Sequence, residues 1–181
     1  PVISAIGNQS INEDSSVVVN FTITDVDSTL SCTMAMSSSS SATALIGSAN
    51  ITFGGTAPNC TATLTPIANQ SGTSDITLTV TDGSLTASTT FQLEVLAIDD
   101  PPTIAAITAK SMLEDGTLTF SFTINDTDTP LICGDPNVLA SSSNSTLLPA
   151  ATIVFGGTAP NCTATFTPQP NQFGTSTITF M

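Results

Sequence analysis

Carboxylates are the side chains best suited to chemistry in this 181-residue chain, because fourteen acidic residues face a single basic one, Lys110. The formal net charge is −13. Because like charges repel, grouped carboxylates favour a bound cation; the alternative is that they only form turns, as Asp-Gly and Asx turns do. Eleven of the fourteen lie in short motifs, namely ED at Glu13–Asp14 and Glu114–Asp115, DxD at 25–27 and 126–128, DG at Asp82, and the pair Asp99–Asp100.

The residue types that the chain lacks exclude several classes of function. One lysine cannot neutralise a run of phosphates, so we expect no nucleic-acid binding. Histidine is absent, which excludes His-ligated zinc and every nucleophile activated by histidine. A glycosidase with two carboxylates is disfavoured because tryptophan and tyrosine, the usual sugar platforms, are also absent. No stretch approaches the ~20 apolar residues that span a bilayer. We therefore expect no enzyme and no membrane insertion.

The elements that must position the carboxylates are β-strands. Apolar residues recur at every second position in segments such as 17–23, 76–82, 91–98 and 118–124, and this period is typical of strands. Seven short strands with turn signals between them predict an all-β Greek-key sandwich of immunoglobulin-like type. In the first part of the chain the candidate strands are 2–6, 17–24, 30–36, 50–54, 59–65, 75–81 and 86–97.

An internal repeat divides the chain into two tandem modules. The segment FGGTAPNCTAT occurs identically at 53–63 and 155–165, and the motifs before it also recur in order. The sequence predicts modules over 1–100 and 101–181, joined at AIDDPPT, where two prolines forbid a helix. The serine-rich stretches 37–44 and 141–146 are interpreted as surface loops.

The second copy lacks its C-terminal strands in this sequence. Met181 corresponds to Thr79, so nothing matches residues 80–100 of the first copy. Such a sandwich is expected to expose an unpaired edge and an open core. Two explanations stay open: the sequence is a window from a longer array, or a strand from another chain completes the fold.

Four cysteines recur at the same two places in each module, which predicts the disulfides Cys32–Cys60 and Cys133–Cys162. A loop of this length stabilises a fold by roughly 3–4 kcal/mol in the chain-entropy model. Two alternatives remain, a metal site with a poor ligand set and two buried free thiols. Disulfides imply an oxidising, extracellular compartment.

Strand parity places the acidic motifs at the ends of the modules. If odd strands run one way and even strands the other, the turns after the second and sixth strands share one end. That end of the first module gathers Asp25, Asp27 and Asp82. If the second module follows below, five carboxylates converge on the junction: Glu13, Asp99, Asp100, Asp126 and Asp128. So many oxygens without a basic partner favour a hard cation, and Ca²⁺ accepts six to eight oxygens with tolerant geometry.

These motifs, in this order and present twice, resemble bacterial cadherin-like and immunoglobulin-like tandem repeats of large surface proteins. The elements that carry the resemblance are ED, DxD, NQSGTSDITLTVTDG at 69–83 and IDDPPT at 98–103. Cadherin-like domains bind Ca²⁺ between consecutive modules, so the resemblance implies that the junction set listed above and the set Asp25, Asp27 and Asp82 are ligands. The acidic motif in the middle of cadherin domains has no counterpart here, where the chain reads PIANQSGT at 66–73. Fewer or weaker calcium ions are therefore expected.

The sequence thus predicts a non-catalytic structural or adhesive module of an extracellular repeat protein, an adhesin or surface stalk, stiffened by Ca²⁺. Its expected partners are further copies of the same module and identical chains. The alternative is a subunit of an extracellular filament or sheath, in which a strand from a neighbouring chain completes the second module.

Overall fold

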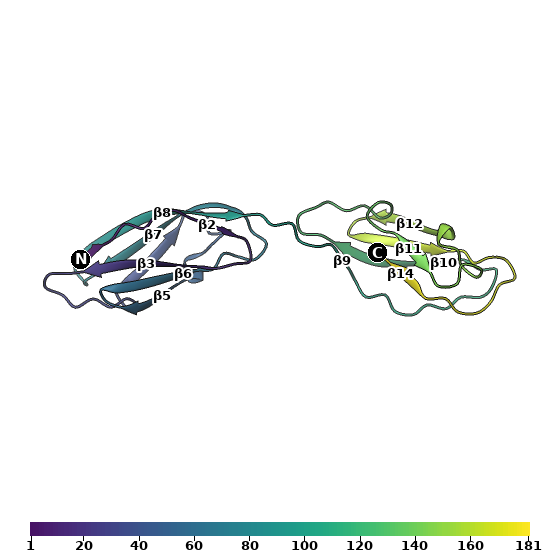
Figure 1. The fold of residues 1–181 in the computed structure, drawn as a ribbon, viewed down its shortest axis with the longest axis horizontal. Coiled ribbons are helices and arrows are strands. Elements are labelled where there is room, and N and C mark those ends of the chain that lie inside the picture. The colour runs from purple at the N-terminus through teal and green to yellow at the C-terminus, as the bar shows by residue number, and fades with distance from the viewer. The chain divides into compact units, whose positions relative to one another are not determined.

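The computed structural model describes all residues, 1–181, and divides into two compact units, Pro1–Ile98 and Asp99–Met181. Both units are all-β, and each contains one single-turn 3-10 helix, η1 (Ser48–Asn50) or η2 (Ala150–Thr152). No helix in the structure has the length and apolar character needed to cross a membrane. The units are described separately below as the first and second modules (Figure 1).

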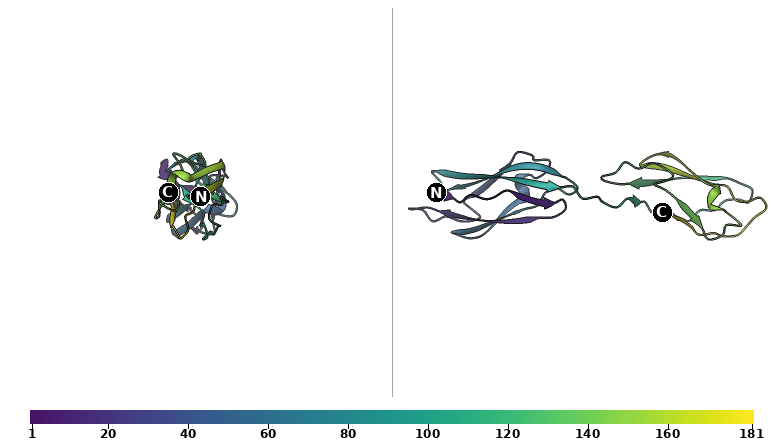
Figure 2. Two further views of the ribbon diagram at one scale, coloured as in Figure 1. Left: turned by 90° about the vertical axis from the view of Figure 1, so that its right-hand side faces the viewer. Right: turned by 45° about the horizontal axis from the view of Figure 1, so that its top comes forward.

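The first module is a sandwich of two four-stranded sheets (Figure 2). With the first two short strands lettered A and A′ and the six that follow lettered B to G, the first sheet has the order A-B-E-D and the second contains A′, C, F and G, which is the immunoglobulin-like arrangement. The first sheet runs β1 (Val2–Ile3), β3 (Val17–Thr24), β6 (Asn59–Leu64), β5 (Ile51–Thr56). The second sheet runs β2 (Gln9–Asn12), β8 (Thr86–Leu96), β7 (Gly72–Thr81), β4 (Met36–Ser40).

The core of the first module comes from the alternation of its strands. Successive side chains of a strand point to opposite faces of a sheet, so every second residue is buried. The inward-facing residues of β3, β7 and β8 are at most 4% exposed: Val19, Phe21, Ile23, Ile76, Leu78, Val80, Phe91, Leu93 and Val95. The all-β sandwich predicted from the period of two is therefore what the chain forms.

The second module repeats the first sheet and only half of the second. Its complete sheet runs β9 (Thr103–Ile104), β10 (Leu118–Asn125), β13 (Asn161–Phe166), β12 (Ile153–Thr158). Its other sheet contains only β11 (Ala140–Ser142) and β14 (Ile178–Phe180), the counterparts of β4 and β7. No strand in this module corresponds to β2 or β8. The core is rich in phenylalanine, and the Phe180 ring lies 5.1 Å from the rings of both Phe122 and Phe155.

The structure corrects three strand predictions in the first module. The strand predicted at 30–36 lies instead at β4, so it falls in the serine-rich stretch that was interpreted as a loop; β11 likewise occupies part of 141–146. The strand predicted at 2–6 is shorter, and β2 was not predicted at all. Serine hydroxyls explain β4: Ser40 Oγ lies 2.8 Å from Oγ of Ser74, a β7 residue that is only 2% exposed. A strand that buries hydroxyls shows no apolar alternation.

The identical segment FGGTAPNCTAT forms the hairpin of β5 and β6 in one module and of β12 and β13 in the other. At its turn Gly55 has φ of 90°, and an added Cβ would lie 2.6 Å from the Asn59 carbonyl oxygen. Gly157 repeats this geometry with φ of 93° and the same 2.6 Å approach to Asn161. Only glycine fits without strain at such a position. The hairpin thereby places Cys60 and Cys162 at the same point of each module.

Candidate functional site

Each module contains one disulfide. It joins the turn before β4 to the β5–β6 hairpin in the first module, and the turn before β11 to the β12–β13 hairpin in the second. Cys32 is bonded to Cys60 with Cα atoms 5.4 Å apart, and Cys133 to Cys162 with Cα atoms 5.3 Å apart. These are the pairs that the repeated positions predict, and no cysteine is left free. The prediction placed a strand at 30–36, which was wrong. Cys32 nevertheless lies beside β6, because the turn at 31–35 packs against the first residues of β6.

One end of the first module gathers Asp25, Asp27 and Asp82, which the sequence predicted to lie together. All three line a cavity of about 470 Å³. One carboxylate oxygen of Asp25 accepts the N–H groups of Asp27 and Ser28, each at 3.1 Å. One oxygen of Asp82 accepts the N–H groups of Ser84 and Leu85 at 2.7 and 2.8 Å. Turn formation therefore uses one carboxylate oxygen of Asp25 and one of Asp82, and leaves the other oxygen of each for a second partner.

In this structure the second partner is the ammonium group of Pro1. Its nitrogen lies 2.7 Å from Asp25 Oδ2 and 3.8 Å from Asp82 Oδ2, and the Asp25 side chain is 3% exposed. The hydrogen bond from the ammonium group, followed by the backbone N–H of Asp27, lowers the pKa of Asp25.

The carboxylates of this cluster also influence each other. A hydrogen bond with the Asp25 side chain, followed by the like charge of that carboxylate, raises the pKa of Asp27. The backbone N–H groups of Leu85 and Ser84 lower the pKa of Asp82 because they bond to its ionised form. The cluster therefore contains carboxylates whose pKa values are shifted in opposite directions.

Glu13 and Asp14 of the ED motif lie at the other end of the first module and bind backbone groups. Glu13 is 8% exposed, and its Oε1 accepts the N–H of Ile98 at 2.7 Å, just after β8 ends. Asp14 has φ of 58° and accepts the N–H of Asn69, whose own φ is 56°. The sequence interpretation assigned Glu13 to a metal and gave Asp14 no role. In the structure, each side chain accepts a hydrogen bond from a backbone N–H group that is distant in sequence.

The Asp14–Asn69 contact recurs in the second module. Asp115 Oδ1 accepts the N–H of Asn171 at 2.8 Å, and both residues again have positive φ, 58° and 57°. Asn and Asp tolerate the left-handed region better than other residues with a Cβ. The repeated NQ after each module's β6-type strand was the signal in the sequence that could have revealed this contact.

The second module gathers Asp100, Asp126 and Asp128 at its own end. Asp126 Oδ1 accepts the N–H groups of Asp128 and Thr129 at 3.0 and 2.8 Å, which repeats the turn at Asp25. Asp128 Oδ2 accepts the N–H of Asp100 at 2.6 Å. Asp99 is exposed. No three His, Cys, Asp or Glu side chains in the structure form a group that could hold a metal ion. The calcium site stays a prediction.

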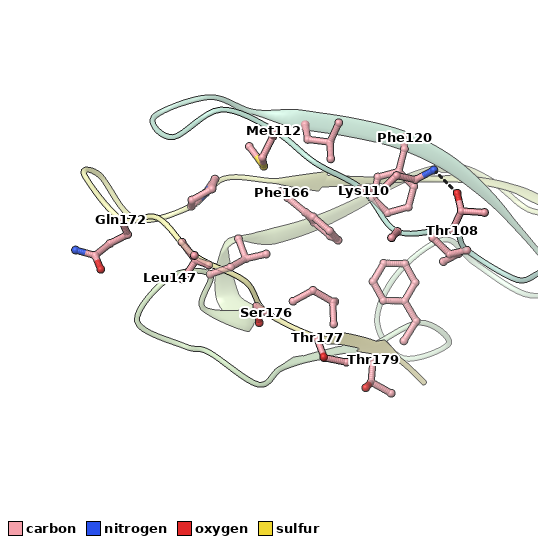
Figure 3. A pocket seen from close by; sticks show the side chains of 18 of the residues that line it. Thr108, Lys110, Met112, Phe120, Leu147, Phe166, Gln172, Ser176, Thr177 and Thr179 are labelled. Atoms are coloured by element: carbon pink, nitrogen blue, oxygen red, sulfur yellow. Dashed lines mark hydrogen bonds between the residues drawn. The ribbon is translucent and has the colours of Figure 1, made fainter.

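A larger opening lies in the second module, where the second sheet has only two strands. It is a groove of about 700 Å³ that opens to solvent. Figure 3 shows Met112 and Lys110 on one side, Ser176, Thr177 and Thr179 on the other, and Phe166 between them. Lys110 Nζ lies 5.2 Å from the centroid of the Phe120 ring and donates to Thr108 at 3.2 Å. The chain's one basic side chain thus borders this groove.

Solved structures similar to this chain are tandem immunoglobulin-like and surface-layer proteins, all at low identity. The titin domains Z1Z2 in complex with telethonin align at 14% identity over 99% of this chain and 92% of that one, with a TM-score of 0.37. The Ig1-2 module of the Drosophila receptor protein tyrosine phosphatase DLAR aligns at 11% identity over 90% and 82%, with a TM-score of 0.40. Domains 1–6 of the surface layer protein SbsC align at 15% identity over 90% and 20%, with a TM-score of 0.37.

No family model matches the sequence, and no curated protein matches it either. The strand order described above, and not these distant likenesses, identifies the modules as immunoglobulin-like sandwiches in tandem.

Proposed function

We propose that the chain is a non-catalytic structural or adhesive part of an extracellular repeat protein, such as a surface adhesin or stalk. The observation that carries the proposal is the repetition: the two modules share the strand order of the first sheet, one disulfide position and the contacts of the ED and DxD motifs. Disulfides at corresponding positions of both modules favour an oxidising compartment outside the cell. The polar groups with unusual environments lie at the ends of modules, where tandem repeats adjoin their neighbours.

We also propose that these acidic ends bind Ca²⁺, as in cadherin-like repeats. One set is Asp25, Asp27 and Asp82, and the second module offers Asp99, Asp100, Asp126 and Asp128. The proposal is supported by the carboxylate oxygens that the turns at Asp25 and Asp82 leave without a backbone partner. Glu13, the remaining predicted ligand, has one oxygen engaged by Ile98 and one left. Oxygen donors of this kind suit Ca²⁺.

Thermal unfolding with Ca²⁺ and with a chelator tests the calcium proposal. Calcium at one hundred times its Kd stabilises the folded state by about 2.7 kcal/mol. For a module of this size that corresponds to a rise in Tm of roughly 10–20 °C. The variant Asp126→Asn with Asp128→Asn should lose the rise in the second module, and Asp75→Asn, which lies outside the ED, DxD and DG motifs, should keep it. A midpoint that stays the same in calcium and chelator contradicts this part of the proposal.

A second candidate function is a filament or sheath subunit in which chains associate by strand addition. It rests on the interpretation that a strand from another chain completes the second module, whose second sheet contains only β11 and β14. Size-exclusion chromatography over a hundredfold range of concentration tests this candidate. A chain that elutes as a monomer throughout, and in mixtures of the two modules, contradicts it.

A further inference from the structure

Eight of the eleven asparagines are followed by one residue other than proline and then by serine or threonine. This Asn-x-Ser/Thr motif is the acceptor for N-linked glycans in secreted proteins. In a chain so rich in serine and threonine the motif also arises by chance, so the fold must decide which copies can carry a glycan. The eight asparagines are Asn8, Asn20, Asn50, Asn59, Asn69, Asn125, Asn144 and Asn161.

Four of the eight are exposed, and their side-chain amides make no hydrogen bond within the protein: Asn20, Asn59, Asn125 and Asn161. Of the rest, Asn50 and Asn144 are half-buried, and both polar atoms of the Asn144 amide are hydrogen-bonded. Asn8 Oδ1 accepts the N–H of Gln92 at 3.0 Å. Asn69 lies at positive φ in the contact with the ED motif. The four free amides are therefore the acceptors that the folded chain presents to solvent.

The two free asparagines of the first module lie on the same surface. Asn20 of β3 lies opposite Thr61 of β6, and Asn59 of β6 lies opposite Thr22 of β3. Each asparagine thus faces the threonine that completes the other motif. Residues that lie opposite each other in a sheet share one face. Both acceptors therefore lie on the outer face of the first sheet.

The second module places its two free asparagines on the corresponding surface. Asn161 is the repeat counterpart of Asn59 and lies opposite Thr123 of β10. Asn125 follows two residues later in β10, so it points to the same face as Thr123. All four acceptors thus lie on the outer face of one sheet type, and none lies on the second sheet.

This sheet differs from the second sheet in its charge. The strands β1, β3, β5 and β6 contain no charged residue, and neither do β9, β10, β12 and β13. The second sheet of the first module carries Asp75 and Glu94. On the uncharged faces Val18 is 55% exposed and Val154 is 61% exposed. An N-linked glycan is bulky and hydrophilic, so it would hydrate a face that has no charge of its own.

We propose that the outer face of the first sheet in each module carries N-linked glycans, at Asn20 and Asn59 in the first module and at Asn125 and Asn161 in the second. The co-substrate is a lipid-linked oligosaccharide, whose first sugar is bonded through its anomeric carbon to a phosphate oxygen. The asparagine Nδ2 forms a bond to that carbon and loses one proton, while the carbon–oxygen bond breaks and the lipid phosphate leaves with the electron pair. The inference rests on the proposed export of the chain and adds a modification that covers one sheet and leaves the other bare.

The test uses the full chain, secreted from a eukaryotic cell that contains an oligosaccharyltransferase. Removal of N-linked glycans by an amidase in heavy-oxygen water converts each occupied asparagine to a labelled aspartate, which mass spectrometry of peptic fragments locates. We expect glycans at the four free asparagines and several-fold lower occupancy at the other four motifs. Thr22→Ala and Thr61→Ala should each remove one glycan without changing its asparagine, and Thr61→Ser, which keeps the motif, should keep the glycan.

Hydroxyl-radical labelling tests whether the glycans cover the face. Val18 lies two residues from Asn20 on the same side of β3, and its labelling should be several-fold lower in the glycosylated chain than in the Thr22→Ala variant. Leu85 is 68% exposed at the end of the module and should be labelled equally in both. Equal labelling of Val18 would overturn the covering of the sheet.

The results separate this inference from the extracellular function. A secreted chain with both disulfides formed and no glycan at the four free asparagines overturns the inference and leaves that function standing. Equal occupancy of all eight motifs also overturns it, because the fold then does not select one face. A chain that is retained in the cell with free thiols contradicts the extracellular function itself.

Discussion

Removing one disulfide should destabilise one module and leave the other unchanged. Cys32 and Cys60 are 28 residues apart, and Cys133 and Cys162 are 29 apart. In the chain-entropy model, closing each loop lowers the entropy of the unfolded chain by about 12 cal/mol/K, which destabilises the unfolded state by about 3.6 kcal/mol at 25 °C. The double variant Cys32→Ala with Cys60→Ala should therefore lower the free energy of unfolding of the first module by about 3–4 kcal/mol.

The assay must distinguish the modules without intrinsic tryptophan or tyrosine fluorescence, since the chain contains neither residue. Hydrogen exchange in urea, read by mass spectrometry of peptic peptides, reports β3 and β10 separately. The matched variant Cys133→Ala with Cys162→Ala should show the mirror-image result, with a loss of similar size because the loops are nearly equal.

Reduction provides the control. A reducing agent should destabilise both modules of the unmodified chain but only the second module of the Cys32→Ala, Cys60→Ala variant. A loss below about 1 kcal/mol in the first module would refute the entropic reasoning. An equal loss in both modules after removal of one pair would refute the independence of the two cores.

Three further outcomes follow from the contacts at the turns and module ends. In urea unfolding, Gly55→Ala should destabilise the first module by about 2–3 kcal/mol, because alanine is strained at positive φ and its Cβ approaches the Asn59 carbonyl oxygen. Gly7→Ala is the control and should change the stability little, because no atom lies within 4 Å of the added Cβ. Asp14→Ala removes the acceptor for Asn69 N–H and should cost about 1–2 kcal/mol, equally with calcium and with chelator, which separates this contact from metal binding. The pKa of Asp82 is lowered in the folded state, so its contribution to stability is complete above the unfolded-state pKa of 3.8 and is lost as the pH falls through the lower folded-state pKa. In an acid titration followed by circular dichroism, Asp82→Asn should therefore reduce the loss of stability over this pH range.

Strands with apolar alternation could be predicted from the sequence, and strands held by hydroxyls could not. The segments 17–24, 59–65 and 75–81 each show a period of two and correspond closely to β3, β6 and β7. In contrast, β4 reads MSSSS, and its place depends on hydrogen bonds to Ser74, a residue more than thirty positions away. A local sequence pattern does not predict a hydrogen-bond partner that is so distant in the sequence.

The candidate site shows the same limit. Motif spacing and strand parity were enough to bring Asp25, Asp27 and Asp82 to one end of the first module. The role of Glu13 was not predictable in this way, because its partner is the backbone of Ile98, and a backbone N–H has no signature in the sequence. The groove could be anticipated as an open core, but its position beside Lys110 required the fold.

The outer faces of the sheets pair hydroxyl with hydroxyl where many proteins place opposite charges. Thr77 meets Thr90, Thr79 meets Ser88 and Thr119 meets Thr165, each at 2.9 Å. A hydroxyl pair neither titrates near neutrality nor weakens as counterions accumulate, unlike exposed ion pairs. The parts of both modules that are held by hydroxyl pairs should consequently keep the same stability at low and at high salt. Dependence on salt should come from the carboxylates, most of which lie at the ends of the modules.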